Sequence, residues 1–194
     1  MAAVNRRDGS EADMNPLERV ARTLDALNET VGRTVAWLTV IMVIAYFTVV
    51  VLRYLFDVGS IAFQESVTYM HAFVFMLGAA YTLKHDGHVR VDVLYRRFGL
   101  RGQAVVDLFG ALGLLLPVSI FILWSSWETV TVSWQRWEGS DETGGLPFVY
   151  VLRTVIPVMA VLMILQGISQ IARCLLILSG NEAAGPEHDA AREI

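Results

Sequence analysis

Four stretches of apolar residues, each long enough to cross a lipid bilayer, dominate the chain. They cover about residues 34–52, 61–83, 104–127 and 154–178, and the first contains no charged residue. A helix needs roughly 20 apolar residues to cross the hydrocarbon core. Barrel strands would be shorter and would alternate in polarity, and backbone groups in lipid must be satisfied internally. The pattern therefore predicts an all-α integral membrane protein with four transmembrane helices, which together form a membrane domain over residues 34–178.

Amphipathic segments are predicted before the first span and between the second and third. Residues 15–33 begin with Asn15-Pro16-Leu17-Glu18, which is typical of a capped helix start. Apolar residues then recur at helical spacing, at Leu17, Val20, Leu24, Leu27 and Val31. This pattern favours an interfacial helix on the membrane surface or against a partner, with a solvated helix as the alternative. A second short interfacial helix is predicted in the middle loop, around Val91, Val93, Leu94 and Phe98.

Basic residues predict the orientation of the spans, because loops rich in Lys and Arg stay in the cytoplasm. The segment before the first span holds five arginines, and the loop between the second and third spans holds five basic residues. The first outer loop has only Arg53, and the third loop has Arg136 and Arg153 against four acids. Both termini are therefore expected in the cytoplasm, with residues 1–14 as a disordered N-terminus and residues 179–194 as a tail.

Overall composition excludes several classes of protein. Only 18% of the residues are charged, the mean hydropathy is +0.50, and the net charge of −4 argues against a nucleic-acid partner. The single cysteine, Cys174, cannot form an internal disulfide or a cysteine metal cluster. The chain contains no phosphate-binding loop, no G-x-S-x-G motif and no H-E-x-x-H motif. The expectation is a membrane protein that is not an enzyme.

The first span is expected to be retained, because bulky residues follow it where a signal peptidase would need small ones.

Ionisable residues within the spans each require an explanation, because an unpaired charge in hydrocarbon costs several kcal/mol. Arg53 and Glu65 flank the first short loop, so an ion pair between them is predicted. Asp107 and Arg173 enter at similar depth near the cytoplasmic side and are candidate partners. Two alternative partners for Asp107 lie in the preceding loop: Arg97 and Arg101.

Two polar stripes follow one face each of the second and fourth predicted spans. The first comprises Gln64, Thr68, His71, Phe75 and Gly78, and the second comprises Gln166, Gln170 and Arg173. Such stripes hold helices together or bind another membrane subunit; the alternative is a path for a solute or proton. Small surfaces for close helix packing are expected at 78–80 and 110–113. His71 has no second histidine at its depth, so haem is not expected, and no other cofactor is predicted.

Aromatic residues are concentrated around the third loop. Trp134 and Trp137 lie within it, and the third helix is predicted to continue beyond the membrane surface to about Gln135. An interfacial aromatic belt explains these tryptophans; a docking surface for an external protein is the alternative.

Short motifs around the second span resemble a known family. They are Arg53-Tyr54-Leu55-Phe56, Phe63-Gln64-Glu65-Ser66, Met76-Leu77-Gly78-Ala79-Ala80 and His88-Val89-Arg90-Val91-Asp92. In order and spacing they resemble the small permease subunit of TRAP transporters, the DctQ-like family, although Phe63 stands where that family often has Trp. The specific part of the resemblance covers about residues 50–95, and the four-span layout agrees over the whole chain.

This resemblance implies a role in a tripartite, ATP-independent secondary transporter of the bacterial inner membrane. A periplasmic solute-binding protein would capture the solute and a large permease subunit would move it. The small subunit would scaffold the large one, in contact with membrane lipid, without binding solute or sodium. Internal repeats and broken helices, which are typical of transporting subunits, are not found in the sequence. A membrane anchor of a respiratory electron-transfer complex and a small self-sufficient channel or carrier are the alternatives.

Overall fold

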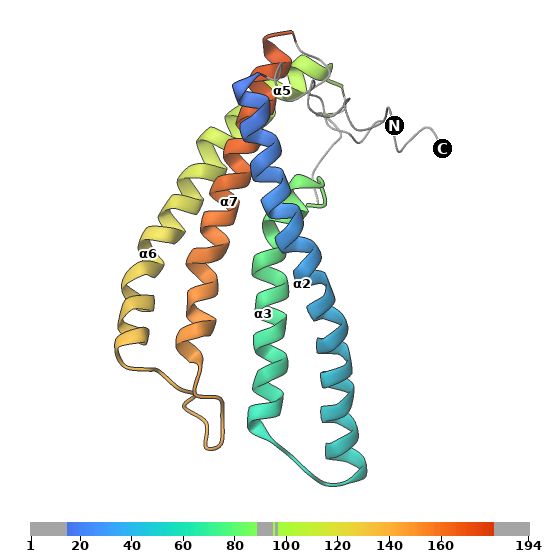
Figure 1. Ribbon diagram of the computed structural model, residues 1–194, viewed down its shortest axis with the longest axis vertical. Coiled ribbons are helices and arrows are strands. Elements are labelled where there is room, and N and C mark those ends of the chain that lie inside the picture. Colours follow the sequence, from blue (N-terminus) through green and yellow to red (C-terminus); the bar gives the residue numbers. More distant parts are fainter. Residues whose placement is uncertain (1–14, 89–94, 96, 181–194) are drawn as a thin grey trace, which may run out of the picture.

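The computed structural model of the chain describes residues 15–88, 95 and 97–180, and all regular structure in that part is helical. Four helical rods are long and apolar enough to cross a membrane, which confirms the predicted number of spans. Their elements are α2 (Pro16–Leu55), α3 (Ile61–Lys84), the rod formed by α5 (Leu100–Gly110), a π-helical turn (Ala111–Leu115) and α6 (Leu116–Gln135), and α7 (Val149–Leu178). Figure 1 shows α2 and α3 as one hairpin beside a second formed by α6 and α7.

The N-terminal amphipathic segment and the first span form one continuous helix, α2. Its start is as predicted, with the Asn15 side chain accepting a hydrogen bond from the Leu17 backbone N–H at 3.2 Å and Pro16 in the first turn. At 1.5 Å per residue the 40 residues of α2 extend about 60 Å, roughly twice the hydrocarbon thickness. Residues 16–33 therefore run in line with the span (Figure 1) instead of forming a separate helix.

The face of this segment that packs inside the protein is not the apolar one. Leu17, Val20 and Leu27 are exposed, whereas Ala21, Asp25, Asn28 and Gly32 are buried. The membrane or partner contact of these apolar residues stays a prediction. The second predicted interfacial helix lies mostly outside the described residues, as do residues 1–14 and 181–194.

The third rod contains a π-helical turn directly before Pro117. Proline lacks the N–H that would bond the carbonyl oxygen four residues earlier, and its ring crowds that carbonyl. The wider turn is closed by the Leu116 N–H, which donates to the Ala111 carbonyl oxygen five residues back. The rod then continues to Gln135, which confirms the predicted extension of this helix beyond the span.

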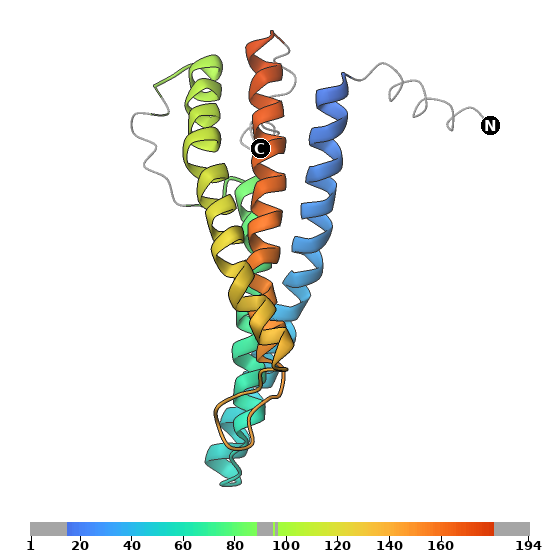
Figure 2. The same cartoon turned by 90° about the vertical axis from the view of Figure 1, so that its left-hand side faces the viewer.

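Helix α7 is the centre of the bundle. It contacts α2, α3, α5 and α6, and Figure 2 shows it between the α5–α6 rod and the start of α2. It contains twelve buried residues, whereas α3 contains only Ala80. The core is therefore built along one helix, and the others present much of their surface outward.

Close helix approach occurs at a different glycine from those predicted. A Cβ added to Gly32 would lie 2.3 Å from ring carbons of Tyr81, so α2 and α3 pack there only because Gly32 has no side chain. An added Cβ at Gly78, Gly110 or Gly113 would meet nothing within 4 Å. Within the chain these three glycines are therefore not points of close approach, whereas Ala80 and Ala111, from the same two predicted surfaces, are buried. A contact of these surfaces with another subunit stays a prediction.

Candidate functional site

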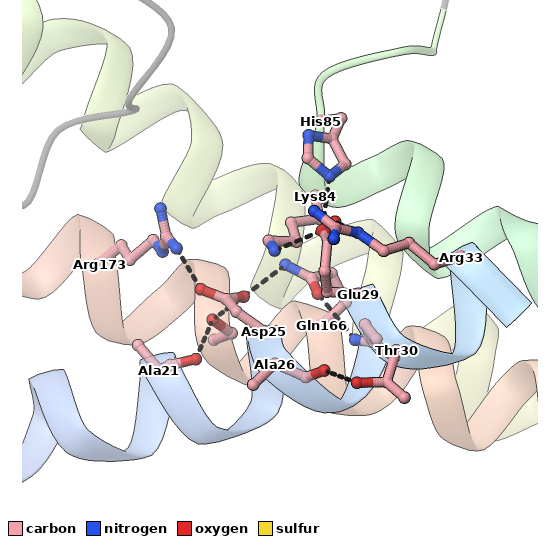
Figure 3. Close-up of polar contacts among 12 residues, drawn as sticks. Ala21, Asp25, Ala26, Glu29, Thr30, Arg33, Lys84, His85, Gln166 and Arg173 are labelled. Atoms are coloured by element: carbon pink, nitrogen blue, oxygen red, sulfur yellow. Dashed lines mark hydrogen bonds and ion pairs between the residues drawn. The ribbon is translucent and has the colours of Figure 1, made fainter.

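A buried polar network joins the first half of α2 to the second half of α7 (Figure 3). The Asn28 amide donates to Gln166 Oε1 at 2.7 Å, and the Gln166 amide donates to Asp25 Oδ1 at 3.1 Å. The Ser169 hydroxyl donates to the same Asp25 oxygen at 2.7 Å. Arg173 forms an ion pair with Asp25 Oδ2. Asp25, which is 4% exposed, is thus neutralised by Arg173 and accepts hydrogen bonds from Gln166 and Ser169. All three partners belong to α7.

The ion-pair partner of Arg173 differs from the prediction. Arg173 pairs with Asp25, and Asp107 accepts a hydrogen bond from the Tyr95 hydroxyl at 2.6 Å. The predicted Asp107–Arg173 pair is therefore wrong, because α2 extends far enough to place Asp25 against α7. Asp25 was not singled out from the sequence because it falls in the segment assigned to the interface. Its spacing with Ala21, Asn28 and Gly32, on one helical face, was the signal available.

The predicted polar stripe of α7 is assembled in part. Gln166 and Arg173 meet at Asp25, and Ser169, which the prediction omitted, connects them. Gln170 is half-buried and takes no part in the network. In the part of the chain with described side chains, this stripe serves contact between helices.

A second charged cluster ties α2 to the end of α3. Glu29 Oε2 lies 2.8 Å from the Lys84 ammonium and 2.8 Å from His85 Nε2, and Glu29 Oε1 lies 2.7 Å from Arg33 Nε (Figure 3). Glu29 precedes the apolar part of α2. The hydrogen bond from Lys84, followed by that from His85, lowers the pKa of its carboxyl from 4.5 to about 2. Glu29 is therefore ionised at neutral pH and fixes α2 to the end of α3.

At the opposite end of the bundle, Glu65 organises the loop between α6 and α7. Its carboxylate accepts a hydrogen bond from the Ser140 hydroxyl and another from the Leu146 backbone N–H, the latter at 2.6 Å. Gly145 permits this approach, since an added Cβ there would lie 2.8 Å from Glu65 Oε2. The predicted Arg53–Glu65 ion pair is not formed. The loop supplies the donors instead, which no spacing in the sequence revealed.

Aromatic side chains join the ends of α6 and α7 near this loop. Tyr150 packs edge-on against Trp134 and Trp137, with ring centroids 4.6 Å and 5.3 Å apart. The Trp134 indole donates to the Thr154 hydroxyl at 2.8 Å, and Arg153 pairs with Glu138 at 2.5 Å. These contacts give Trp134, at the end of α6, and Trp137, in the loop, a role inside the chain, whereas the interfacial belt stays a prediction.

The other candidate residues predicted from the sequence lie on the surface of the bundle or outside the residues that the structure describes. Gln64, Thr68 and His71 line a seam between α2 and α3, and His71 stacks on Phe75 with ring centroids 6.5 Å apart. Contact of this stripe with another subunit stays a prediction. His88 is exposed, and Asp92 lies outside the described residues. Among the described residues no group of three or more His, Cys, Asp or Glu side chains could hold a metal ion.

Large apolar side chains cover the outward faces of α2 and α6. On α2 these include Trp37, Phe47 and Tyr54, and on α6 Trp124 and Phe121, each more than 60% exposed. Surfaces of this kind are stable in contact with lipid or with another protein. The fold and these faces define the class: a multi-pass helical membrane protein in which the buried Asp25 carboxylate is paired with Arg173 inside the bundle.

Comparison with known protein families identifies the family to which the chain belongs. The model of the family described as "Tripartite ATP-independent periplasmic transporters, DctQ component" matches residues 42–176, more than two thirds of the 194 residues. The chain belongs to this family: it is a small membrane subunit for solute transport and not an enzyme. No curated protein sequence and no solved structure shows significant similarity to it.

Proposed function

We propose that this chain is the fixed scaffold of a TRAP transporter, bracing a large permease subunit without carrying the solute. The observation that supports the proposal most strongly is the contrast between its interior and its surface. Asp25, Gln166 and Arg173 satisfy one another inside the bundle. The apolar part of α2, by contrast, has a mean hydropathy of 2.6 and no buried residue.

A subunit built in this way exposes apolar helix faces that another membrane subunit can contact. It has few polar groups with which to move a solute. Polar groups in a transport path must exchange partners with the solute, whereas Asp25, Gln166, Ser169 and Arg173 bond one another. Apolar helix faces associate in the membrane through close packing. The large permease subunit is the proposed occupant of the α2 and α6 faces, and a periplasmic solute-binding protein completes the transporter.

The bacterial inner membrane, with both termini in the cytoplasm, is the proposed location. The five arginines before the first span and the five basic residues after the second support this orientation. It would place the α2–α7 network and the Glu29 cluster at the cytoplasmic side, and the Glu65 loop at the periplasmic side.

Co-purification tests the scaffold role. A tagged copy expressed in its native host is extracted in mild detergent, and the retained proteins are identified by mass spectrometry. The expected result is a large hydrophobic permease subunit in stoichiometric amount. Recovery of the chain without any such partner, from membranes that contain the permease, would contradict the proposal.

A further inference from the structure

A groove runs along the seam between the second half of α2 and the first half of α3. Its end near the hairpin loop has a volume of about 340 Å³ and is lined by Arg53, Tyr54 and Gln64, among others. The adjoining section, of about 450 Å³, is lined by Met42, Val43 and His71 together with residues of the first section. The two sections share Tyr46, Val67 and Thr68, so they form one continuous groove.

The chemistry of the groove changes along its length. At the hairpin end the Arg53 guanidinium makes no ion pair or hydrogen bond with any residue that the structure describes, because Glu65 is bound by the α6–α7 loop. The Gln64 side-chain amide beside it is also without a partner among those residues. Toward the middle of the bundle the lining becomes almost wholly apolar, with Met42, Val43 and Val67. A ligand that fits must therefore carry an anion at one end and a hydrocarbon chain at the other.

The length of the groove matches one leaflet of a bilayer. From residue 42 to residue 53 helix α2 rises eleven steps of about 1.5 Å, or about 16 Å. Half of the hydrocarbon core measures about 15 Å. Arg53 lies in the last turn of α2, where the exposed Tyr54 and Phe56 mark the aromatic level of the interface. A headgroup phosphate at Arg53 would thus place an acyl chain along the groove to about the bilayer midplane.

We propose that this groove binds one phospholipid of the leaflet at the hairpin end, with its phosphodiester on Arg53 and Gln64 and one acyl chain against Val43 and Val67. Arginine suits this role because its planar donors match phosphate oxygens and it remains charged at an interface. A transmembrane helix of another subunit fits less well, since it would continue across the midplane and offers no anion for Arg53. The proposal does not depend on the scaffold role.

Native mass spectrometry of the full chain in detergent tests the headgroup contact. The probes are dioleoylphosphatidylglycerol and dioleoylglycerol, which carries the same acyl chains without the phosphate. The unaltered chain is expected to retain one phosphatidylglycerol and no dioleoylglycerol, with no displacement by inorganic phosphate. One basic residue near the membrane surface is worth about 1 kcal/mol of lipid attraction, so Arg53→Gln should weaken retention roughly fivefold.

Arg136→Gln is the matched control, because Arg136 is an exposed arginine at the same end of the bundle and does not line the groove. It should retain the lipid as the unaltered chain does. Equal retention by Arg53→Gln and the unaltered chain would overturn the proposal, as would equal retention of dioleoylglycerol.

A second variant tests the acyl-chain section. Thr68→Phe places a ring where both sections meet, and Ile44→Phe places the same ring on α2 outside the groove, at a position 60% exposed. Only Thr68→Phe should lose the phosphatidylglycerol. If Arg53→Gln and Thr68→Phe instead release the large permease subunit while lipid retention is unchanged, the groove holds a protein partner and the lipid proposal is wrong.

Discussion

The two halves of α2 belong to the same helix but are held by different interactions. The first half buries Asp25 and Asn28 against α7 and is joined to it by specific hydrogen bonds and an ion pair. The second half has no buried residue in its apolar stretch and touches its neighbour, α3, along one seam. Hydrogen bonds and an ion pair, which depend on direction, position the first half of the helix. The surface of the second half is apolar and makes contacts that do not depend on direction. The position of α2 is thus specified by its polar half, and its apolar half is free to contact other molecules.

The largest effect is expected from removing the anion of the polar half. Asp25→Ala leaves Arg173, Ser169 and the Gln166 amide without their shared acceptor. Breaking a buried pair by deleting one partner costs about 3–5 kcal/mol; because the Arg173 side chain is 34% exposed, about 2–4 kcal/mol of lost stability is expected. Thermal or denaturant unfolding in detergent measures it.

The control for this substitution is Asp141→Ala, an exposed loop acid that should change stability by less than about 0.5 kcal/mol. The double substitution of Asp25 and Arg173 by alanine should cost less than the sum of the two single substitutions. Strict additivity would show that the two side chains do not interact, and would remove the basis for contrasting the two halves of α2.

The second-largest loss of stability is expected from a substitution where the two halves of α2 meet. Gly32→Ala brings a methyl group to 2.3 Å from Tyr81 and forces α2 and α3 apart, at a cost of about 1–3 kcal/mol. Gly78→Ala is the matched change on α3, with nothing within 4 Å of the added methyl group. It should be neutral or stabilising by up to about 1 kcal/mol, because alanine favours helix. Unfolding of the two variants side by side measures the difference, and equal destabilisation would contradict the close approach at Gly32.

A smaller effect distinguishes Glu65 from Arg53 at the hairpin end. Glu65→Gln weakens two hydrogen bonds to the α6–α7 loop and should lower the unfolding midpoint of the chain, by less than Gly32→Ala does. Arg53→Gln should leave the stability of the lipid-free chain unchanged, since no described residue pairs with it. Had the two side chains formed an ion pair, both substitutions would destabilise the chain to a similar extent. Unfolding in lipid-free detergent decides between these outcomes.

The smallest effect on stability is expected on the apolar half itself. Trp37 is 73% exposed, so Trp37→Ala should change the unfolding free energy of the isolated chain by less than about 0.5 kcal/mol. The same substitution should reduce co-purification of the large permease subunit, if this face is the contact. A loss of stability comparable to that of Asp25→Ala would mean that the second half of α2 is packed within the chain.

Much of the fold was predictable because it depends on local hydrophobicity. The four spans follow from runs of apolar residues, the start of α2 from Asn15 and Pro16, and the end of α6 at Gln135 from the aromatic residues around the third loop. The ion pairs were not predictable in the same way. Depth in the membrane suggested Asp107 for Arg173, but the partner is determined by which helices cross, and the length of α2 brings Asp25 there.

The loop around Glu65 illustrates the same limit. Its donors are a serine hydroxyl and a backbone N–H from residues 140 and 146, which lie more than seventy positions away in the sequence. Backbone donors leave no trace in side-chain composition. Gly78 was chosen as a packing glycine by its small neighbours, whereas Gly32 has that role because it faces Tyr81 across the hairpin.

Site-specific photo-cross-linking in native membranes tests the central claim most directly. A photoreactive phenylalanine analogue is placed at Phe47, on the exposed half of α2, and in a second variant at Leu176, which is 2% exposed on α7. The account predicts a cross-link from position 47 to a second, larger membrane protein, and no such product from position 176. A large partner captured from position 176, or none from position 47 in membranes that contain the permease, would contradict it.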